Sequence, residues 1–289
     1  MKKTIVYKQG HNYEILGDFY PVSTKNRPVI VYIHGGGLLW GSREDLKIHQ
    51  VEYYHQAGFN VFSIDYRLAP ESKLPDIVED VESALQWIEH EATAHFDVDS
   101  SKIAVIGSSA GAYLALMSGT FQRKPQAIVS FYGYGDITGD WAIRPNRHYQ
   151  AMTAVPQELA DMLISNQPIS VGPIEKRYAI YMHARQQGQW IDRITGLNPV
   201  SNKSELATFC PLSYASENFP PTLLLHGTKD EDVPYEQSLL MNNALSDAGT
   251  PSKLITIPDA GHVFDDDWSH PVVQHAFEEV ISFLQTHLK

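Results

Sequence analysis

The feature that most constrains the fold of this 289-residue chain is the pentapeptide Gly-Ser-Ser-Ala-Gly at residues 107–111. It follows Lys102–Ile106, a short apolar segment that predicts a buried strand, and it precedes Ala112–Met117, which predicts a helix. A G-x-S-x-G sequence between a strand and a helix indicates a nucleophile elbow, a turn so tight that its ends must lack side chains. Such a turn lifts the hydroxyl of Ser109 above the sheet edge and aims the N-terminus of the next helix at the reacting carbonyl oxygen.

Segments with the character of strands alternate with amphipathic segments along most of the chain. In one of the latter, Ile77, Val81, Leu85 and Ile88 have the spacing of one helical face, and Glu44–Gly58 is also predicted to be a helix. This alternation predicts the α/β class, with a mostly parallel eight-stranded sheet flanked by helices. The expected strands are Thr4–Gln9, Tyr13–Tyr20, Arg27–His34, Phe59–Tyr66, Lys102–Ile106, Ala127–Tyr132, Thr222–Leu225 and Lys253–Ile257.

The length of the chain predicts one large domain over residues 1–289. An irregular segment, approximately 135–219, is too long to be a structureless loop in a compact domain. It contains two helix-compatible pieces, Gln157–Ser165 and Glu175–Gln186. We therefore expect a helical insertion that folds over the ends of the strands.

A serine hydroxyl is a poor nucleophile and needs a base that is held by an acid. In this architecture the acid and then the histidine follow the serine, each in a loop after a later strand. Asp230 follows the strand Thr222–Leu225, and His262 follows the strand Lys253–Ile257. These positions predict Asp230 as the acid and His262 as the base. The weaker rivals are Glu231 and Asp232 for the acid, and His226 and His270 for the base.

The sequence His-Gly-Gly-Gly at residues 34–37 directly follows an apolar strand. Acyl transfer builds negative charge on a carbonyl oxygen, and preorganised backbone N–H groups stabilise that charge. We expect Gly36, Gly37 and Ala110 to supply three such donors, and His34 to brace the loop. A phosphate-binding loop is excluded, because no Lys-Ser/Thr follows and the G-x-G-x-x-G spacing is absent.

The formal net charge of −12 argues against nucleic acid as a partner. One cysteine, Cys210, allows no intrachain disulfide. Neither a His-Glu-x-x-His motif nor paired cysteines occur, so we expect no metal and no cofactor. No signal-peptide core and no apolar run of 18 residues occur, which predicts a cytoplasmic protein without a membrane span. The sequence leaves homo-oligomerisation open.

Five motifs together resemble those of the α/β-hydrolase superfamily: HGGGLLWGS, DYRLAPE, GSSAG, HGTKDEDVP and DAGH. The chain is most similar to the hormone-sensitive-lipase-like and BD-FAE-like esterases, from about Val29 to its C-terminus. HGTKDEDVP is closer to the acid loop of prolyl-oligopeptidase-like hydrolases and acyl-thioesterases, which leaves an alcohol, thiol or amine open as leaving group. In this family an insertion often forms a cap over the acyl pocket. We expect its large aromatic residues, Trp141 and Trp190 among them, to narrow that pocket.

The resemblance implies a serine carboxylesterase that acts on small short-chain acyl esters and needs no cofactor. An amide-bond hydrolase with the same three residues, exopeptidase-like or arylformamidase-like, is the alternative. A more remote one is a non-catalytic binding protein on a hydrolase scaffold. Such proteins usually lack one member of the triad, whereas Ser109, Asp230 and His262 are all present in this chain.

Overall fold

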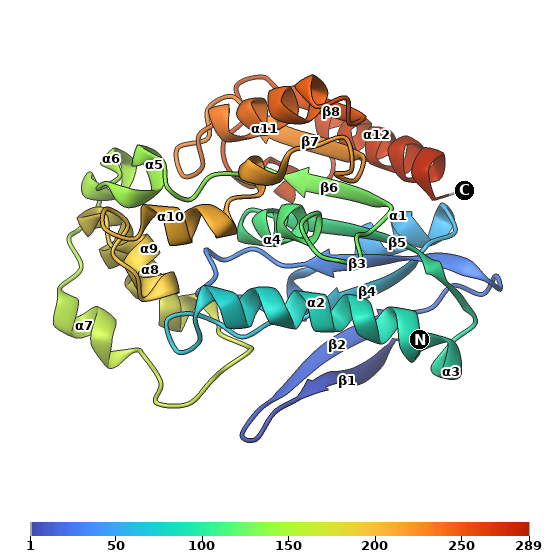
Figure 1. The fold of residues 1–289 in the computed structure, drawn as a ribbon, viewed down its shortest axis with the longest axis horizontal. Coiled ribbons are helices and arrows are strands. Elements are labelled where there is room, and N and C mark those ends of the chain that lie inside the picture. The colour runs from blue at the N-terminus through green and yellow to red at the C-terminus, as the bar shows by residue number, and fades with distance from the viewer. Residues whose placement is uncertain (1, 289) are drawn as a thin grey trace.

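The computed structural model describes residues 2–288. Eight strands form one sheet in the order β1-β2-β4-β3-β5-β6-β7-β8 (Figure 1). The β1–β2 and β2–β4 pairs are antiparallel and the others are parallel, so the predicted mostly parallel α/β sheet is confirmed. The strands are β1 (Lys3–Gln9), β2 (Glu14–Tyr20), β3 (Arg27–Ile33), β4 (Asn60–Ile64), β5 (Val98–Ser108), β6 (Ala127–Phe131), β7 (Thr222–Gly227) and β8 (Ser252–Ile257).

Helices cover both faces of this sheet, and each face has its own apolar core. In β3, Val29, Val31 and Ile33 belong to the core under α2, α4 and α11, whereas Ile30 and Tyr32 belong to the core under α1 and α12. Burial on both faces explains why the central strands are continuously apolar. The helices outside residues 135–219 are α1 (Ile48–Gln56), α2 (Leu74–His90), α3 (Ala92–His95), α4 (Ala110–Ser118), α11 (Glu236–Asp247) and α12 (Pro271–His287).

The helix expected over Glu44–Gly58 is shorter than predicted. Arg43–Asp45 form a separate 3₁₀ turn, and α1 begins only at Ile48. The turn is held in place by Arg43, whose guanidinium lies 2.6 Å from Asp65 and 3.2 Å from Asp18, two fully buried carboxylates. These contacts with β2 and with the end of β4 outweigh the local preference for a continuous helix.

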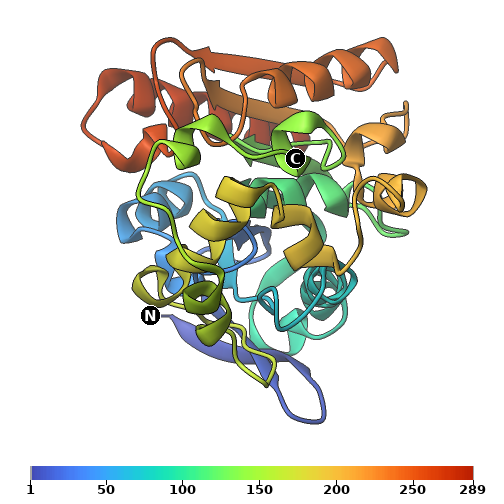
Figure 2. The ribbon, with the colours of Figure 1, turned by 90° about the vertical axis from the view of Figure 1, so that its left-hand side faces the viewer.

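Residues 135–219 supply six α-helices that lie together beside the carboxyl ends of the strands (Figures 1 and 2). The two helix-compatible pieces of the sequence correspond to α7 and α8. We refer to this segment as the cap. No helix within residues 2–288 has the length and apolar character needed to cross a membrane. The cap helices are α5 (Asp140–Ile143), α6 (Arg147–Gln150), α7 (Gln157–Met162), α8 (Ile174–Gln187), α9 (Trp190–Thr195) and α10 (Lys203–Leu206).

Candidate active site

The elbow between β5 and α4 has the predicted geometry. Ser109 has φ 54° and ψ −118°, a strained conformation that a residue other than glycine adopts only where its surroundings impose it. The surroundings here are backbone atoms. A Cβ atom on Gly111 would lie 2.1 Å from the carbonyl oxygen of Ile33, and one on Gly107 would lie 2.1 Å from the carbonyl oxygen of Gly111. Strand and helix therefore meet only because both end positions lack a side chain.

Ser109, His262 and Asp230 form one hydrogen-bonded series. Nδ1 of His262 donates to Oδ2 of Asp230 at 2.7 Å, because a carboxylate can only accept. This bond leaves Nε2 free to accept from the hydroxyl of Ser109, which lies 2.9 Å away. The three side chains come from the ends of β5, β7 and β8, where the carboxyl ends of parallel strands meet.

Asp230 is held from two further directions. Its Oδ1 accepts the backbone N–H groups of Asp232 and Val233 at 3.0 and 2.9 Å, which folds the loop after β7 around the carboxylate. Its Oδ2 also lies 3.1 Å from Nε2 of His226. His226 is fully buried, and its Nε2 faces two acceptors, Oδ2 of Asp230 and the carbonyl of Val233 at 3.0 Å. Nε2 therefore carries the proton and donates, and Nδ1 accepts from the hydroxyl of Ser238. A residue considered as a rival base thus orients the acid instead.

The other three candidate residues make different contacts. His270 accepts from the backbone N–H of Val272 and caps α12. Glu231 is 70% exposed and pairs with His148 of the cap at 2.8 Å. Asp232 lies on the opposite side of the His262 ring from Asp230, 3.9 Å from Nε2.

The surroundings shift the pKa values of the acid and the base in opposite directions. Burial of Asp230 raises the pKa of its carboxyl, but the hydrogen bonds from His226 and His262 outweigh burial and hold that pKa well below its usual range. Burial lowers the pKa of His262, but its hydrogen bond to Asp230 and the charges of Asp232 and Asp265 outweigh burial and raise that pKa. An ionised acid beside a more basic imidazole is the arrangement that general-base chemistry needs.

The loop after β3 has the open backbone that its glycines predict. Gly36 and Gly37 have φ values of 97° and 59°, and a Cβ on Gly36 would lie 2.0 Å from the carbonyl oxygen of Trp40. Within residues 2–288, the N–H groups of both glycines and of Ala110 have no protein acceptor. Ala110 is the first residue of α4, so its N–H lies at the positive end of a helix.

Side chains of the cap hold this loop in place, and one of them, Arg177, was not singled out by the sequence. The indole N–H of Trp190 donates to the carbonyl of Gly37 at 3.0 Å, and Arg177 donates to the carbonyl of Leu39. Trp190 is only 1% exposed. The sequence predicted that Trp190 narrows the pocket. The structure differs, because this buried indole supports the glycine-rich loop through the carbonyl of Gly37. His34 braces the loop as expected, with Nδ1 2.8 Å from the carbonyl of Gly35.

Arg177 also explains part of the DYRLAPE sequence. Its guanidinium donates to both carboxylate oxygens of Glu71, at 2.9 and 2.6 Å, and to the carbonyl of Ala69 at 2.6 Å. The two charged side chains are 4% and 1% exposed. This buried pair connects α8 of the cap to the loop after β4 and to the glycine-rich loop. The sequence carries no local signal for it, since the partners are 106 residues apart.

Two cavities are bordered by residues adjacent in sequence to the site residues, and the lining of neither includes Ser109, Asp230 or His262. A groove of about 640 Å³ is bordered by Trp40, by Val263 next to His262, and by the start of α8. A smaller cavity of about 150 Å³ is bordered by Gly35 and Ser108, the neighbours of the glycine pair and of Ser109. In the region that the structure describes, no three side chains of His, Cys, Asp or Glu are arranged to bind a metal ion.

The chain has the α/β-hydrolase fold. A solved structure of an α/β hydrolase superfamily protein from Enterococcus faecalis is 24% identical, covers 99% of both chains and has a TM-score of 0.80. The propionate-bound thermophilic esterase Est2 from Thermogutta terrifontis is 22% identical, covers 99% of this chain and 94% of its own, and has a TM-score of 0.69.

The BD-FAE family model matches residues 18–245, and this protein belongs to that family. Among curated proteins, the non-reducing polyketide synthase ausA from Penicillium brasilianum is 30% identical over 317 aligned positions. That match covers 91% of this chain but only 13% of the synthase.

Proposed function

We propose that the protein is a serine carboxylesterase that hydrolyses small, short-chain acyl esters through an acyl-enzyme intermediate. The observation that carries the proposal is the series in which Nε2 of His262 lies 2.9 Å from the Ser109 hydroxyl and Nδ1 lies 2.7 Å from Asp230. A base within hydrogen-bond reach of the nucleophile and oriented by an acid is the arrangement of serine hydrolases. Membership of the BD-FAE family agrees with it.

In the proposed reaction His262 takes the proton of Ser109 as the serine oxygen bonds to the carbonyl carbon. The N–H groups of Gly36, Gly37 and Ala110 stabilise the negative oxygen of the tetrahedral intermediate. When the intermediate collapses, His262 gives its proton to the leaving alcohol. A water molecule, deprotonated by His262, then attacks the carbonyl carbon of the acyl-enzyme. The second tetrahedral intermediate collapses, His262 returns the proton to Ser109, and the carboxylic acid is released.

The preference for short acyl groups is supported by the enclosure of the site. The ring of Tyr181 and the ring of Trp40 lie so close to Gly37 that a Cβ there would be 2.7 and 3.4 Å from them. The similarly folded Thermogutta terrifontis esterase was solved with propionate, a short carboxylic acid. We propose that this protein also accepts acyl groups of that size.

The test combines covalent labelling with turnover. A fluorophosphonate probe should label the wild-type protein at Ser109, and Ser109→Ala should lose both labelling and hydrolysis of p-nitrophenyl acetate, the latter by about 10⁴-fold or more. The matched control is Ser108→Ala, which removes the adjacent hydroxyl and should keep both. Retained turnover in Ser109→Ala with unchanged thermal unfolding would contradict the proposal. Faster turnover of an aminoacyl anilide or of N-formylkynurenine than of any ester would favour the amide-hydrolase alternative.

A further inference from the structure

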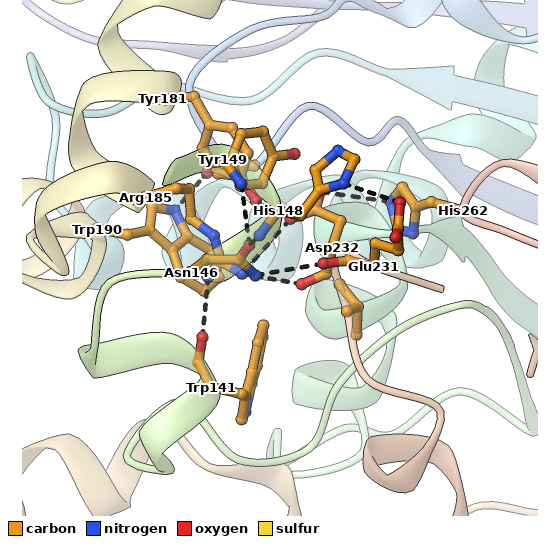
Figure 3. Close-up of polar contacts among 12 residues, drawn as sticks. Trp141, Asn146, His148, Tyr149, Tyr181, Arg185, Trp190, Glu231, Asp232 and His262 are labelled. Atoms are coloured by element: carbon orange, nitrogen blue, oxygen red, sulfur yellow. Dashed lines mark hydrogen bonds and ion pairs between the residues drawn. The ribbon is translucent and has the colours of Figure 1, made fainter. Parts of the chain in front are cut away.

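Asp232 anchors one carboxylate oxygen in the cap and presents the other to the candidate active site. Oδ1 accepts a hydrogen bond from the hydroxyl of Tyr181 at 2.7 Å and lies 3.5 Å from Nη2 of Arg185. Oδ2 lies 3.9 Å from Nε2 of His262, and no donor within residues 2–288 forms a hydrogen bond with it. Figure 3 shows the cap side chains on one side of Asp232 and His262 on the other. The carboxylate is thus fixed while Oδ2 can still accept from a substrate.

Arg185 fixes Asp232 from the side away from His262. It donates to the backbone carbonyl of Asp232 at 2.9 Å, and its side chain is 1% exposed. Four rings enclose it, with centroids 5.2–5.8 Å from the guanidinium carbon: Trp141, Tyr149, Tyr181 and Trp190. These rings stabilise the cation on the Oδ1 side of the carboxylate. The charges of Arg185 and Asp232 thus compensate one another inside the protein, and Oδ2 of Asp232 faces His262.

The groove that reaches Val263, beside His262, is acidic and has an aromatic wall. Glu44, Asp45 and Glu175 border it, against one lysine, Lys47. Its wall includes Trp40, whose ring is 5.1 Å from that of Tyr181 and 5.7 Å from that of Tyr178. Aromatic faces combined with carboxylates are the surroundings that favour an ammonium group.

We propose that Asp232, with the ring of Trp40 and the acidic groove, forms a subsite for a cationic group on the alcohol part of the substrate ester, an inference that rests on the proposed esterase function. The leaving oxygen must approach Nε2 of His262 to receive its proton. Oδ2 of Asp232 lies 3.9 Å from the same nitrogen. An ammonium group a short way along the alcohol from the ester oxygen therefore reaches this carboxylate.

The first experiment compares two acetates of the same shape. Acetylcholine carries a quaternary ammonium where 3,3-dimethylbutyl acetate carries a neutral carbon. The wild-type protein should favour acetylcholine in kcat/KM by at least about tenfold, as expected for opposite charges in a partly screened site. Asp232→Asn should bring the ratio close to one. Because both esters are measured on the same variant, any effect of Asp232 on His262 cancels in the ratio.

Glu231→Gln is the matched control, since it removes the same charge from the neighbouring residue, whose side chain is 70% exposed. It should retain the wild-type ratio. A wild-type ratio near one, an unchanged ratio in Asp232→Asn, or an equal fall in Glu231→Gln would each overturn the subsite.

Calorimetric titration with choline and with 3,3-dimethylbutanol tests the subsite without any turnover. Choline should bind the wild-type protein at least about tenfold more tightly than the neutral alcohol, and Asp232→Asn should lose this difference. Equal binding of the two alcohols overturns the subsite even if esters are hydrolysed. Selective choline binding without hydrolysis of either acetate supports the subsite and contradicts the esterase function.

Discussion

The two carboxylates closest to His262 have different partners and therefore different expected roles. Asp230 receives hydrogen bonds from two imidazoles and two backbone N–H groups, and it faces Nδ1 of His262. Asp232 is bound to Tyr181 of the cap and lies near Nε2. Only the carboxylate at Nδ1 can fix the tautomer in which Nε2 accepts the serine proton. Asp230 and Asp232 are only two residues apart in the sequence, yet they lie at opposite nitrogens of the His262 ring.

Asp230→Asn should reduce kcat on p-nitrophenyl acetate by about 10³-fold or more, because an amide nitrogen can donate to Nδ1 and stabilise the wrong tautomer. Asp232→Asn should cost about tenfold or less on this neutral ester. Steady-state kinetics of both variants make the comparison, and thermal unfolding establishes that both are folded. Equal losses, or a larger loss at Asp232, would show that the acid is misassigned.

The pH dependence should report the raised pKa of His262. The imidazole must be neutral to accept the proton of Ser109, so kcat/KM falls as the pH falls through its pKa. The hydrogen bond that His262 donates to Asp230 and the charges of Asp232 and Asp265 outweigh burial, and the midpoint should therefore lie above the usual value of 6.5. Asp232→Asn removes one of these charges and should move the midpoint of a pH–kcat/KM profile to lower pH. Glu231→Gln should leave it in place, and a midpoint below 6.5 in the wild type would contradict the assignment.

At the scale of elements, α8 connects the cap to the body of the protein. Arg177 contacts the glycine-rich loop through the carbonyl of Leu39 and the loop after β4 through Glu71. Tyr181, one turn further along α8, reaches the loop after β7 through Asp232. One helix thus contacts three of the loops that surround Ser109, so the stability of the cap and the geometry of the site are coupled.

Glu71→Gln should lower the free energy of unfolding by about 3 kcal/mol, because it leaves the buried guanidinium of Arg177 without its counter-charge. The double variant Glu71→Gln/Arg177→Met should be less destabilised than the sum of the single changes, since it removes both charges. Urea unfolding measures each value. Arg144→Met, which breaks the exposed pair with Asp140, is the control and should change stability little. A loss at Glu71 no larger than that at Arg144 would contradict the role of the buried pair.

At the scale of the whole molecule, the cap limits the space over the carboxyl ends of the strands. We expect kcat/KM on p-nitrophenyl esters to peak at acyl groups of about two to four carbons and to fall steeply by octanoate. Each methylene without a place in the pocket forfeits roughly 0.8 kcal/mol of burial, and steric clashes add to this loss. Trp40→Ala should relax the preference more than Trp141→Ala, because the Trp40 ring lies beside Gly37 of the glycine-rich loop. An optimum at ten carbons or longer, or activity only above the micellar concentration, would indicate a lipase instead.

The fold class and the order of the candidate site residues could be predicted from the sequence. Continuously apolar segments and helical periodicity predicted the eight-stranded sheet, because the pattern of apolar residues is a local property that each segment carries in its own residues. The elbow glycines and the glycines at 36 and 37 were also predictable, since their backbone conformations exclude most side chains. The positions of Ser109, Asp230 and His262 after successive strands predicted that their side chains meet, as they do in the structure.

The partner of each side chain depends on the tertiary structure. That structure placed Asp230 rather than Asp232 at Nδ1 of His262, directed Trp190 to the back of the glycine-rich loop, and paired Arg177 with Glu71. These contacts join residues from distant parts of the chain. Their geometry depends on how the cap packs against the sheet, and this packing is a sum of many weak contacts that no local pattern records.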